Sequence, residues 1–378
     1  MISIHDLLES AIQHRASDLI LKAGAPPMMR VDGRVVPTQR EAMTSEDTEA
    51  LAESIIYTSS RDHLLRIRNP QARAEEADQL NAESMLARLR EQEEIDLVFT
   101  IPDLVRVRAN IYLQQATVAT ALRIIPLRPR SLDELNLPPV LRDLVARPQG
   151  LILVTGPTGS GKSTTLAGLI QQINSTRAAN VVTIEDPIEY VFEDKMSMIQ
   201  QREIGQDTRS FGAALRSVLR QSPDVIMVGE MRDPATIEVA LTAAEVGHLV
   251  LSTLHTSGAP QTVDRIMNSF PTEKRQQIAA QIAGGLLCVA SQRLVPRASG
   301  VGRVPAVEVM TGSPTVKRQI ETGDIGTLAE SIREGAHFGM QSFNMSLAFL
   351  ADRGVISADT AIANSPDQAE LRPMLRRG

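Results

Sequence analysis

The chain has 378 residues, of which 43% are hydrophobic and 22% are charged, and its formal net charge is −6. This length favours two domains over one. No apolar run reaches the roughly 18 to 20 residues of a membrane span, and the first residues lack the pattern of a signal peptide. A single cysteine excludes a disulfide framework and a tetracysteine zinc site. We therefore expect a cytoplasmic protein, and the acidic, tryptophan-free composition disfavours a nucleic-acid groove.

The first third of the chain predicts a small α+β domain. Helical spacing of apolar residues predicts a helix over 3–15, and a second helix is expected over 44–57. Between them, the segments MMRV and RVV flank Asp32 and Gly33, a pair that favours the type I′ turn of a β-hairpin. From 94 to 125, apolar and polar residues alternate, which is typical of strands with one face on a core.

A stretch rich in Ala, Glu, Arg and Gln interrupts this domain at about 69–94. Such a charged run usually forms a solvated face, so we expect a helix or a partly ordered loop, with a partner-binding insertion as the alternative. Residues 126–139 contain four prolines and are typical of a linker. The predicted boundaries are 1–128 for the N-terminal domain, 129–148 for the linker and 149–378 for the second domain.

The second domain predicts an α/β fold. Short apolar strands (LILVT, VVTIE, DVIMVG and HLVLSTL) alternate with helical patterns, which indicates a mostly parallel sheet covered by helices on both faces. Asp233 and Pro234 are suited to start a helix after the third strand, and Gly247 is suited to end it. A long helical pattern over 272–294 and a strand RVPAVEV follow.

The most specific motif is GPTGSGKST, which follows LILVT and precedes a helix-compatible segment. This order of strand, glycine-rich loop and helix is that of a P-loop. Its glycines let backbone N–H groups surround a β-phosphate, its lysine supplies a cation for the β- and γ-phosphates, and the hydroxyl of Ser163 is suited to ligate Mg²⁺. We therefore predict that nine residues bind a nucleoside triphosphate: Gly156, Pro157, Thr158, Gly159, Ser160, Gly161, Lys162, Ser163 and Thr164.

Two carboxylates and a histidine are expected at the carboxyl ends of neighbouring strands, where open α/β sheets bind ligands. Glu230 follows Gly229, which stands where a Walker B aspartate is usual, so we assign Glu230 as the base that activates water. Glu185 is assigned to the outer shell of the metal or to the γ-phosphate, and for both acids the alternative role is a helix cap. His255 is a candidate γ-phosphate sensor. His248 flanks the same strand seven positions earlier, which disfavours a metal pair.

Three arginines of the first domain have two possible roles. Arg106 and Arg108 share the polar face of the strand VRVRANIYL, and Arg123 raises the same question on the next strand. They are either solvated on an open sheet face or cations delivered to a nucleotide in a neighbouring subunit. The pattern alone leaves both roles open. Cys288 is expected as a small buried hydrophobic residue on a helix.

Five segments together resemble the secretion-type ATPases, and most of all the type IV pilus retraction, or twitching motility, ATPases. These segments are GPTGSGKSTT, TIEDPIEY, SPDVIMVGEMRD, ALTAAEVGHLVLSTLHT and FGMQSF, in the order of the family. The similarity extends from SDLILKAGAPPMMRVDG to GMQSFNMSL. It implies a ring-shaped hexamer in which each subunit pairs a PAS-like N-terminal domain with a RecA-like P-loop core. ATP hydrolysis would change the orientation of these domains and thereby drive retraction.

The resemblance also implies residue roles. Lys162 and Ser163 match the Walker A lysine and hydroxyl. Glu185 matches the acid of the Asp box, and Glu230 matches the catalytic glutamate of Walker B. ATP and Mg²⁺ are the cofactors that this set implies.

Further matches concern histidines and arginines. His248 and His255 match the two histidines of the His box. Arg106, Arg108 and Arg123 match N-domain arginines that reach a nucleotide at a subunit interface. The partners implied are an inner-membrane pilus platform protein and, in some systems, a paralogous pilus ATPase. Membrane contact is expected only through the platform protein, and no nucleic acid is expected.

Two segments depart from the family pattern. The insertion over about 69–91 is longer than usual, and 315–322 reads TVKRQIET where retraction motors commonly carry an AIRNLIRE-like helix. An accessory retraction paralogue is therefore an alternative to the main motor. A pilus-assembly or type II secretion ATPase fits less well, because those relatives usually carry a tetracysteine zinc element. The remaining alternatives are a RecA-like nucleic-acid translocase and a regulatory subunit of another motor.

Overall fold

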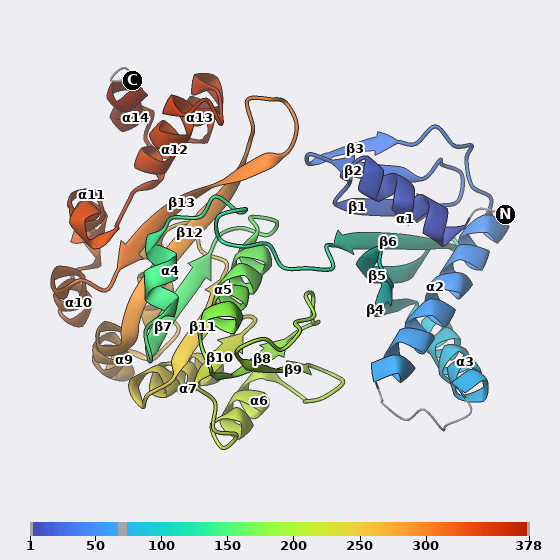
Figure 1. The fold of residues 1–378 in the computed structure, drawn as a ribbon, viewed down its shortest axis with the longest axis horizontal. Coiled ribbons are helices and arrows are strands. Elements are labelled where there is room, and N and C mark those ends of the chain that lie inside the picture. Colours follow the sequence, from blue (N-terminus) through green and yellow to red (C-terminus); the bar gives the residue numbers. More distant parts are fainter. Residues whose placement is uncertain (1–2, 67–73, 376–378) are drawn as a thin grey trace. The chain divides into compact units, whose positions relative to one another are not determined.

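The structure is a computed structural model that describes residues 3–66 and 74–375 (Figure 1). The chain divides into two compact units, Met1–Arg128 and Pro129–Gly378. Each unit has its own sheet. Among the described residues, no helix is both long enough and apolar enough to cross a membrane.

The first unit is built on a six-stranded antiparallel sheet with the order β3-β2-β1-β6-β5-β4. Its strands are β1 (Asp18–Lys22), β2 (Met28–Val31), β3 (Arg34–Pro37), β4 (Glu94–Ile101), β5 (Val105–Gln114) and β6 (Thr117–Ile125). Its helices are α1 (Ile4–Gln13), α2 (Ser45–Arg66) and α3 (Ala74–Gln92). Alternate residues of the strands, such as Leu97, Phe99 and Val107, share one hydrophobic core with these helices. This arrangement confirms the predicted α+β class of the first domain.

The predicted hairpin is present between β2 and β3. Asp32 and Gly33 both have positive φ angles, 47° and 87°, as a type I′ turn requires. Val31 pairs with Arg34 across this turn. Glycine carries no Cβ that would oppose the second angle, which explains why this dipeptide fixes the register.

The charged insertion forms helix α3, and one side of this helix is part of the core. Ala82 and Leu89 are buried, and Met85 and Leu86 pack against the same core. Their spacing of three and four residues places them on one helical face. The expectation of a merely solvated face is therefore wrong for this side of the helix. Residues 69–73 of the predicted insertion lie outside the described residues.

The second unit is a seven-stranded sheet with the order β13-β12-β7-β11-β10-β8-β9. Its strands are β7 (Gly150–Thr155), β8 (Asn180–Glu185), β9 (Met198–Glu203), β10 (Val225–Val228), β11 (Leu249–Leu254), β12 (Leu286–Pro296) and β13 (Arg303–Thr311). All neighbours pair in parallel except β12 and β13, which are antiparallel. The parallel pairing confirms the predicted α/β class.

The central strands of this sheet are apolar on both faces, so both faces must be shielded from water, and helices cover each of them. The helices are α4 (Val140–Val145), α5 (Lys162–Thr176), α6 (Phe211–Val218), α7 (Pro234–Glu245), α8 (Ala259–Asn268), α9 (Thr272–Gly285), α10 (Pro314–Glu321), α11 (Leu328–Glu334), α12 (Phe343–Asp352), α13 (Ala358–Asn364) and α14 (Gln368–Leu375). Ile152 and Val154 of β7 lie in one core cluster with α4 and α5, whereas Leu151 and Leu153 lie in another with α6 to α9.

The start of α7 follows the sequence prediction. Asp233 is the N-cap and accepts a hydrogen bond from the backbone N–H of Thr236 at 2.8 Å, and Pro234 occupies the first turn. Gly247, with a φ of 118°, follows the end of the helix. The N-cap at Asp233 stabilises the helix by about 1 kcal/mol and helps to set where α7 begins after β10.

The helix predicted over 272–294 is too long by nine residues at its C-terminus, because α9 ends at Gly285 and β12 begins at Leu286. Two consecutive glycines precede this change, and glycine is a poor helix former. The apolar residues that follow pair in parallel with β7. Cys288 is buried as predicted, although it lies on β12 rather than on a helix, and burial raises the pKa of its thiol.

The segment predicted as a linker, 129–148, packs on the second unit. Leu132, Leu137, Leu141 and Val145 are buried in the core cluster that also holds α5. The prolines interrupt regular secondary structure here, but the leucines of the segment are buried in the core, so the segment is part of the second unit rather than a free linker.

Candidate nucleotide-binding site

The P-loop connects the end of β7 to the start of α5, as the motif predicts. Gly156, Gly159 and Gly161 have φ angles of 146°, 77° and 92°, a region that favours glycine. A Cβ on Gly156 would lie 2.4 Å from the carbonyl oxygen of Gln292. The loop therefore requires glycine at its first position for two reasons, the backbone angle and the closeness of β12.

Lys162 is curled back over this loop. Its Nζ donates hydrogen bonds to the carbonyl oxygens of Gly156 at 2.8 Å and Pro157 at 3.1 Å. Burial lowers the pKa of Lys162, and the negative charge of Glu230 opposes this shift. Ser160 is buried, and its hydroxyl oxygen has no hydrogen-bond partner among the described residues. The loop thus combines the cation of Lys162, the buried hydroxyl of Ser160 and a backbone at Gly156 that leaves no room for a Cβ.

The remaining residues of the motif begin helix α5. Ser163 is exposed, whereas the hydroxyl of Thr164 lies 3.3 Å from that of Tyr190. The positive end of the helix dipole lies at this N-terminus. Glycine backbone, lysine, helix terminus and exposed serine together fit a nucleotide phosphate chain with Mg²⁺.

Glu230 lies just beyond the end of β10, and both of its carboxylate oxygens have partners. Oε1 lies 3.1 Å from His255 Nε2, and Oε2 lies 2.9 Å from Arg232 Nη2. Partial burial acts to raise the pKa of Glu230, but the hydrogen bonds and charges of Arg232 and His255 outweigh it and hold this pKa below its ordinary value. Glu230 is therefore ionised at neutral pH.

The backbone next to Glu230 is held by both neighbouring strands. The N–H of Gly229 donates to the carbonyl of Ile184 at 2.8 Å, and the hydroxyl of Thr253 donates to the carbonyl of Gly229 at 2.7 Å. A Cβ on Gly229 would lie 3.2 Å from that Ile184 oxygen, which is tight. Glycine replaces the usual aspartate where the strands approach closely.

Glu185 ends β8 and is buried. Thr183 and Gln201 donate hydrogen bonds to its Oε1 at 2.6 and 3.1 Å. Burial raises the pKa of Glu185 to about 7, although these hydrogen bonds act to lower it. The carboxyl of Glu185 therefore titrates near neutral pH, whereas Glu230 at the same edge of the sheet is ionised there.

The two histidines lie at opposite ends of β11. His255 is half-exposed at the carboxyl end, beside Glu230. His248 precedes the first residue of β11, which pairs with Gly150 at the start of β7, and its Nδ1 lies 2.8 Å from the carbonyl of Pro223. Six strand residues span about 20 Å, so His248 lies at the edge of the sheet remote from the P-loop. Within this unit His248 is therefore not near the loop, and its assignment to the catalytic set stays a prediction.

The three arginines lie on two strands of the first unit. Arg106 is 2% exposed and donates a hydrogen bond to Thr100 at 2.9 Å, which excludes the solvated role for this residue. Arg108 is paired with Asp96 at 3.9 Å. Arg123 lies 3.2 Å from Asp18, and more than half of its side chain is exposed. Arg108 and Arg123 keep exposed surface for a further partner.

Several buried polar residues behind the P-loop were missed from the sequence. Gln292 of β12 contacts both Ser160 and Thr165, and its neighbour Ser291 shares a hydrogen bond of 2.7 Å with Thr155 at the end of β7. The signal was present as the three polar residues SQR inside the otherwise apolar strand LLCVASQRLVP. It was obscured because the segment was predicted as a helix.

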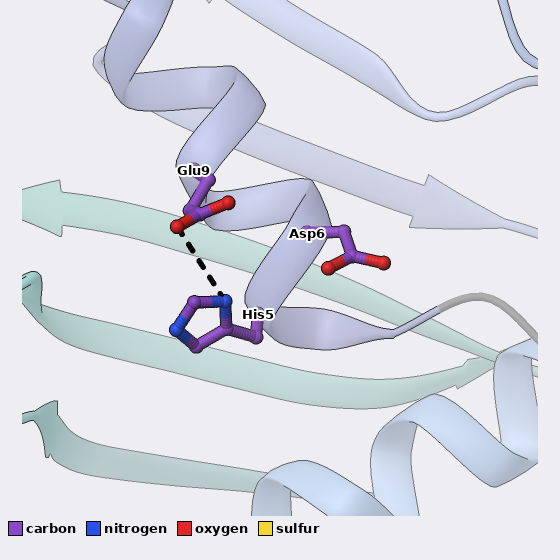
Figure 2. A group of neighbouring side chains, drawn as sticks. All are labelled: His5, Asp6 and Glu9. Atoms are coloured by element: carbon purple, nitrogen blue, oxygen red, sulfur yellow. Dashed lines mark ion pairs between the residues drawn. The ribbon is translucent and has the colours of Figure 1, made fainter.

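A second group of titratable side chains lies on α1 in the first unit. Figure 2 shows His5, Asp6 and Glu9, with His5 3.8 Å from Glu9. All three are exposed, and their ligand atoms are close enough to share a metal ion. Exposed groups of this kind are common without one, so we assign them no role.

Comparison with known proteins places this site in a family. Residues 2–323 match the family model for type II/IV secretion system proteins. The chain is 39% identical to the type IV pilus retraction ATPase PilT of Pseudomonas aeruginosa, over 95% of this chain and 97% of that protein. It is 43% identical to a twitching motility protein of Neisseria gonorrhoeae, over 95% of this chain and 89% of that protein.

Solved structures agree with this placement and with the predicted fold. The crystal structure of the pilus retraction motor PilT with bound ADP matches with a TM-score of 0.81 at 39% identity, over 99% of this chain and 100% of that one. The ATPase DotB of Legionella pneumophila matches with a TM-score of 0.79 at 29% identity, over 96% and 95%. These similarities confirm the resemblance drawn from the five segments. The chain belongs to the type II/IV secretion system protein family.

Proposed function

We propose that this protein is an ATP-hydrolysing motor subunit that drives type IV pilus retraction. The observation that carries the proposal is Glu230. Its ionised carboxylate stands at the carboxyl edge of the sheet, fixed between His255 and Arg232, and its charge acts on Lys162 of the P-loop. A positioned base beside a triphosphate loop supports hydrolysis rather than binding alone.

The residues of the loop fit ATP with Mg²⁺. The N–H groups of the loop and the first turn of α5 would surround the β-phosphate, and Lys162 would exchange its contacts with Gly156 and Pro157 for phosphate oxygens. Ser163 would ligate Mg²⁺ through its hydroxyl, and Glu185 would act on the metal's outer shell. The metal, when bound, neutralises charge on the β- and γ-phosphates.

Hydrolysis requires that water attack the γ-phosphorus while the bond to the leaving ADP oxygen breaks. Glu230 would orient this water and accept its proton, and Lys162 would stabilise charge on the phosphate oxygens. His255 Nε2 can contact either an oxygen of Glu230 or the γ-phosphate, but not both at once. Exchange between these two partners would let His255 sense the γ-phosphate. ADP and inorganic phosphate are the products.

The motor would act as a homo-hexamer in the cytoplasm, touching the inner membrane only through a pilus platform protein. Arg108 and Arg123, which keep exposed surface, are the candidates for reaching a neighbour's nucleotide. The burial of Arg106 favours a structural role for that residue. Nucleotide-dependent affinity between subunits would convert each turnover into a change of domain orientation.

An accessory retraction motor is a second candidate. The chain is 34% identical to the type IV pilus ATPase PilU of Pseudomonas aeruginosa, over 98% of this chain and 91% of that protein. This identity is close to the 39% shared with the retraction ATPase PilT, so one genetic test has to distinguish the two roles.

Two experiments test the proposal. The Glu230→Gln variant should bind ATP with unchanged affinity and lose turnover by a factor of about 10² to 10⁴, because the base is lost and the loop is kept. Glu238→Gln on α7 makes the same chemical change at a surface residue paired with Lys274, and should hydrolyse ATP normally. Wild-type turnover in Glu230→Gln would refute the assignment of the base.

Deletion of the gene followed by imaging of surface pili tests the biological role. Excess pili that do not retract are expected for the main motor. Weakened retraction that is restored only together with a second ATPase indicates the accessory role. Loss of pili would contradict retraction and indicate assembly or secretion.

A further inference from the structure

A buried glutamine on β12 contacts the P-loop from behind. Gln292 is 1% exposed, and both ends of its carboxamide are used. Nε2 donates to the carbonyl oxygen of Ser160 at 2.7 Å, and Oε1 accepts from the hydroxyl of Thr165 at 2.9 Å. Its backbone carbonyl lies against Gly156. One residue thus contacts the start of the loop, its middle and the first turn of α5.

The contact with Ser160 determines where the next backbone N–H points. In a planar trans peptide, the carbonyl of one residue and the N–H of the next point in opposite directions. Because the Ser160 carbonyl is directed at Gln292, the N–H of Gly161 is directed away from β12. Inward-pointing N–H groups are what a P-loop offers to a phosphate.

The contact with Thr165 fixes the helix that follows the loop. Thr165 is buried in the first turn of α5, so its hydroxyl must find a partner inside the protein. The same carboxamide therefore ties the orientation of the loop to that of the helix terminus. Loss of the carboxamide would leave the Ser160 carbonyl and the Thr165 hydroxyl without this partner, and the loop would be free to turn.

We propose that Gln292 is a positioning residue of the nucleotide site, which holds the P-loop in the shape that binds the β-phosphate. This inference rests on the proposed function, because it takes the loop to be the ATP site. The β-phosphate is common to ATP and ADP, so Gln292 contributes equally to the binding of both. The hydrogen bonds of its side chain go to Ser160 and Thr165, not to Glu230 or His255. We therefore expect Gln292 to contribute little to the chemical step at saturating ATP.

The test is the Gln292→Met variant, which keeps the length of the side chain and removes both hydrogen-bonding groups. Calorimetric titration should show that the Kd values for ADP and for a non-hydrolysable ATP analogue both rise by about tenfold, the effect of one buried hydrogen-bond partner lost. The ratio of the two Kd values and kcat at saturating ATP should stay near those of the wild type.

Gln341→Met is the matched control. Gln341 donates to the carbonyl of Val307 at 2.7 Å, and Val307 pairs with Gln292 across β12 and β13. The same change there removes a hydrogen bond from the same pair of strands without touching the loop. Its effect on the unfolding midpoint measures the general cost, and its Kd values should equal those of the wild type.

Three results would overturn the inference: unchanged Kd values in Gln292→Met, a loss confined to the ATP analogue, or an equal loss in Gln341→Met. If Gln292→Met does not fold, Thr165→Val removes one of the two contacts, and both Kd values should still rise together. Failure of the wild-type protein to bind either nucleotide would instead refute the proposed function.

Discussion

Replacing Glu185 by glutamine should stabilise the second unit above neutral pH and remove much of its pH dependence. Burial raises the pKa of Glu185 from 4.5 to about 7, so the folded state holds this proton more tightly than the unfolded state does. The stability that the bound proton contributes is complete below about pH 4.5 and is lost as the pH rises through about 7. At about 1.4 kcal/mol for each pH unit between the two pKa values, ionisation of the buried carboxyl costs about 3 kcal/mol by about pH 8.

Glutamine has the same shape as the protonated acid, and its oxygen can still accept the hydrogen bonds from Thr183 and Gln201. Urea unfolding followed by circular dichroism, with EDTA present, gives the free energy of unfolding at about pH 5 and about pH 8. We expect the variant to gain about 2 to 3 kcal/mol over the wild type at the higher pH and little at the lower. Glu193→Gln, the same change at an exposed site nearby, should stay within about 0.5 kcal/mol at both. Equal or lower stability of Glu185→Gln at both pH values would refute the reasoning, since it would mean that the charged form is favoured in the fold.

Four further substitutions test the site and the first unit. Gly156→Ala should abolish detectable ADP binding in a titration, because its φ of 146° is strained for alanine and its Cβ would meet the Gln292 carbonyl; binding close to that of the wild type would contradict this. His255→Ala should lower kcat by about tenfold or more, whereas His248→Ala should leave it within about twofold. A larger effect of His248→Ala in a steady-state assay would contradict the inference that His255 is the histidine that acts at the site. Leu89→Ala should lower the unfolding free energy of the first unit by about 2 to 3 kcal/mol, as measured by urea unfolding, and a change below about 0.5 kcal/mol would mean that α3 is not part of its core.

The parts of the site that the sequence predicted are those fixed by local rules. A P-loop needs glycine at defined positions and a lysine before the helix, so its motif carries the conformation with it. Glu230 and His255 were placed by a second rule, that parallel strands bring their carboxyl ends to one edge of the sheet. Their separation of 3.1 Å follows from the pairing of β10 with β11.

The roles of the arginines depended on contacts that strand periodicity does not contain. Alternation placed Arg106 and Arg108 on one face, and the structure agrees that both alternate with the core residues of β5. It could not tell that Arg106 is buried beside Thr100 of the paired strand β4 while Arg108 stays partly exposed. Burial of a long polar side chain is decided by what covers it, and that cover comes from other elements.

The error at β12 and the failure to identify Gln292 have the same cause. Leu286 and the apolar residues after it suit a buried helix and a buried strand equally, and periodicity cannot decide between them. The choice is made by β7, which lies more than a hundred residues earlier in the chain and pairs with this segment. As part of a helix, Gln292 would be one polar residue near an exposed end. As part of a strand beside β7, it lies directly behind the loop that β7 leads into, where a carboxamide has two partners to satisfy. Polar residues within an apolar strand next to a P-loop strand therefore indicate a support for the loop. The segment must first be recognised as a strand before this can be inferred.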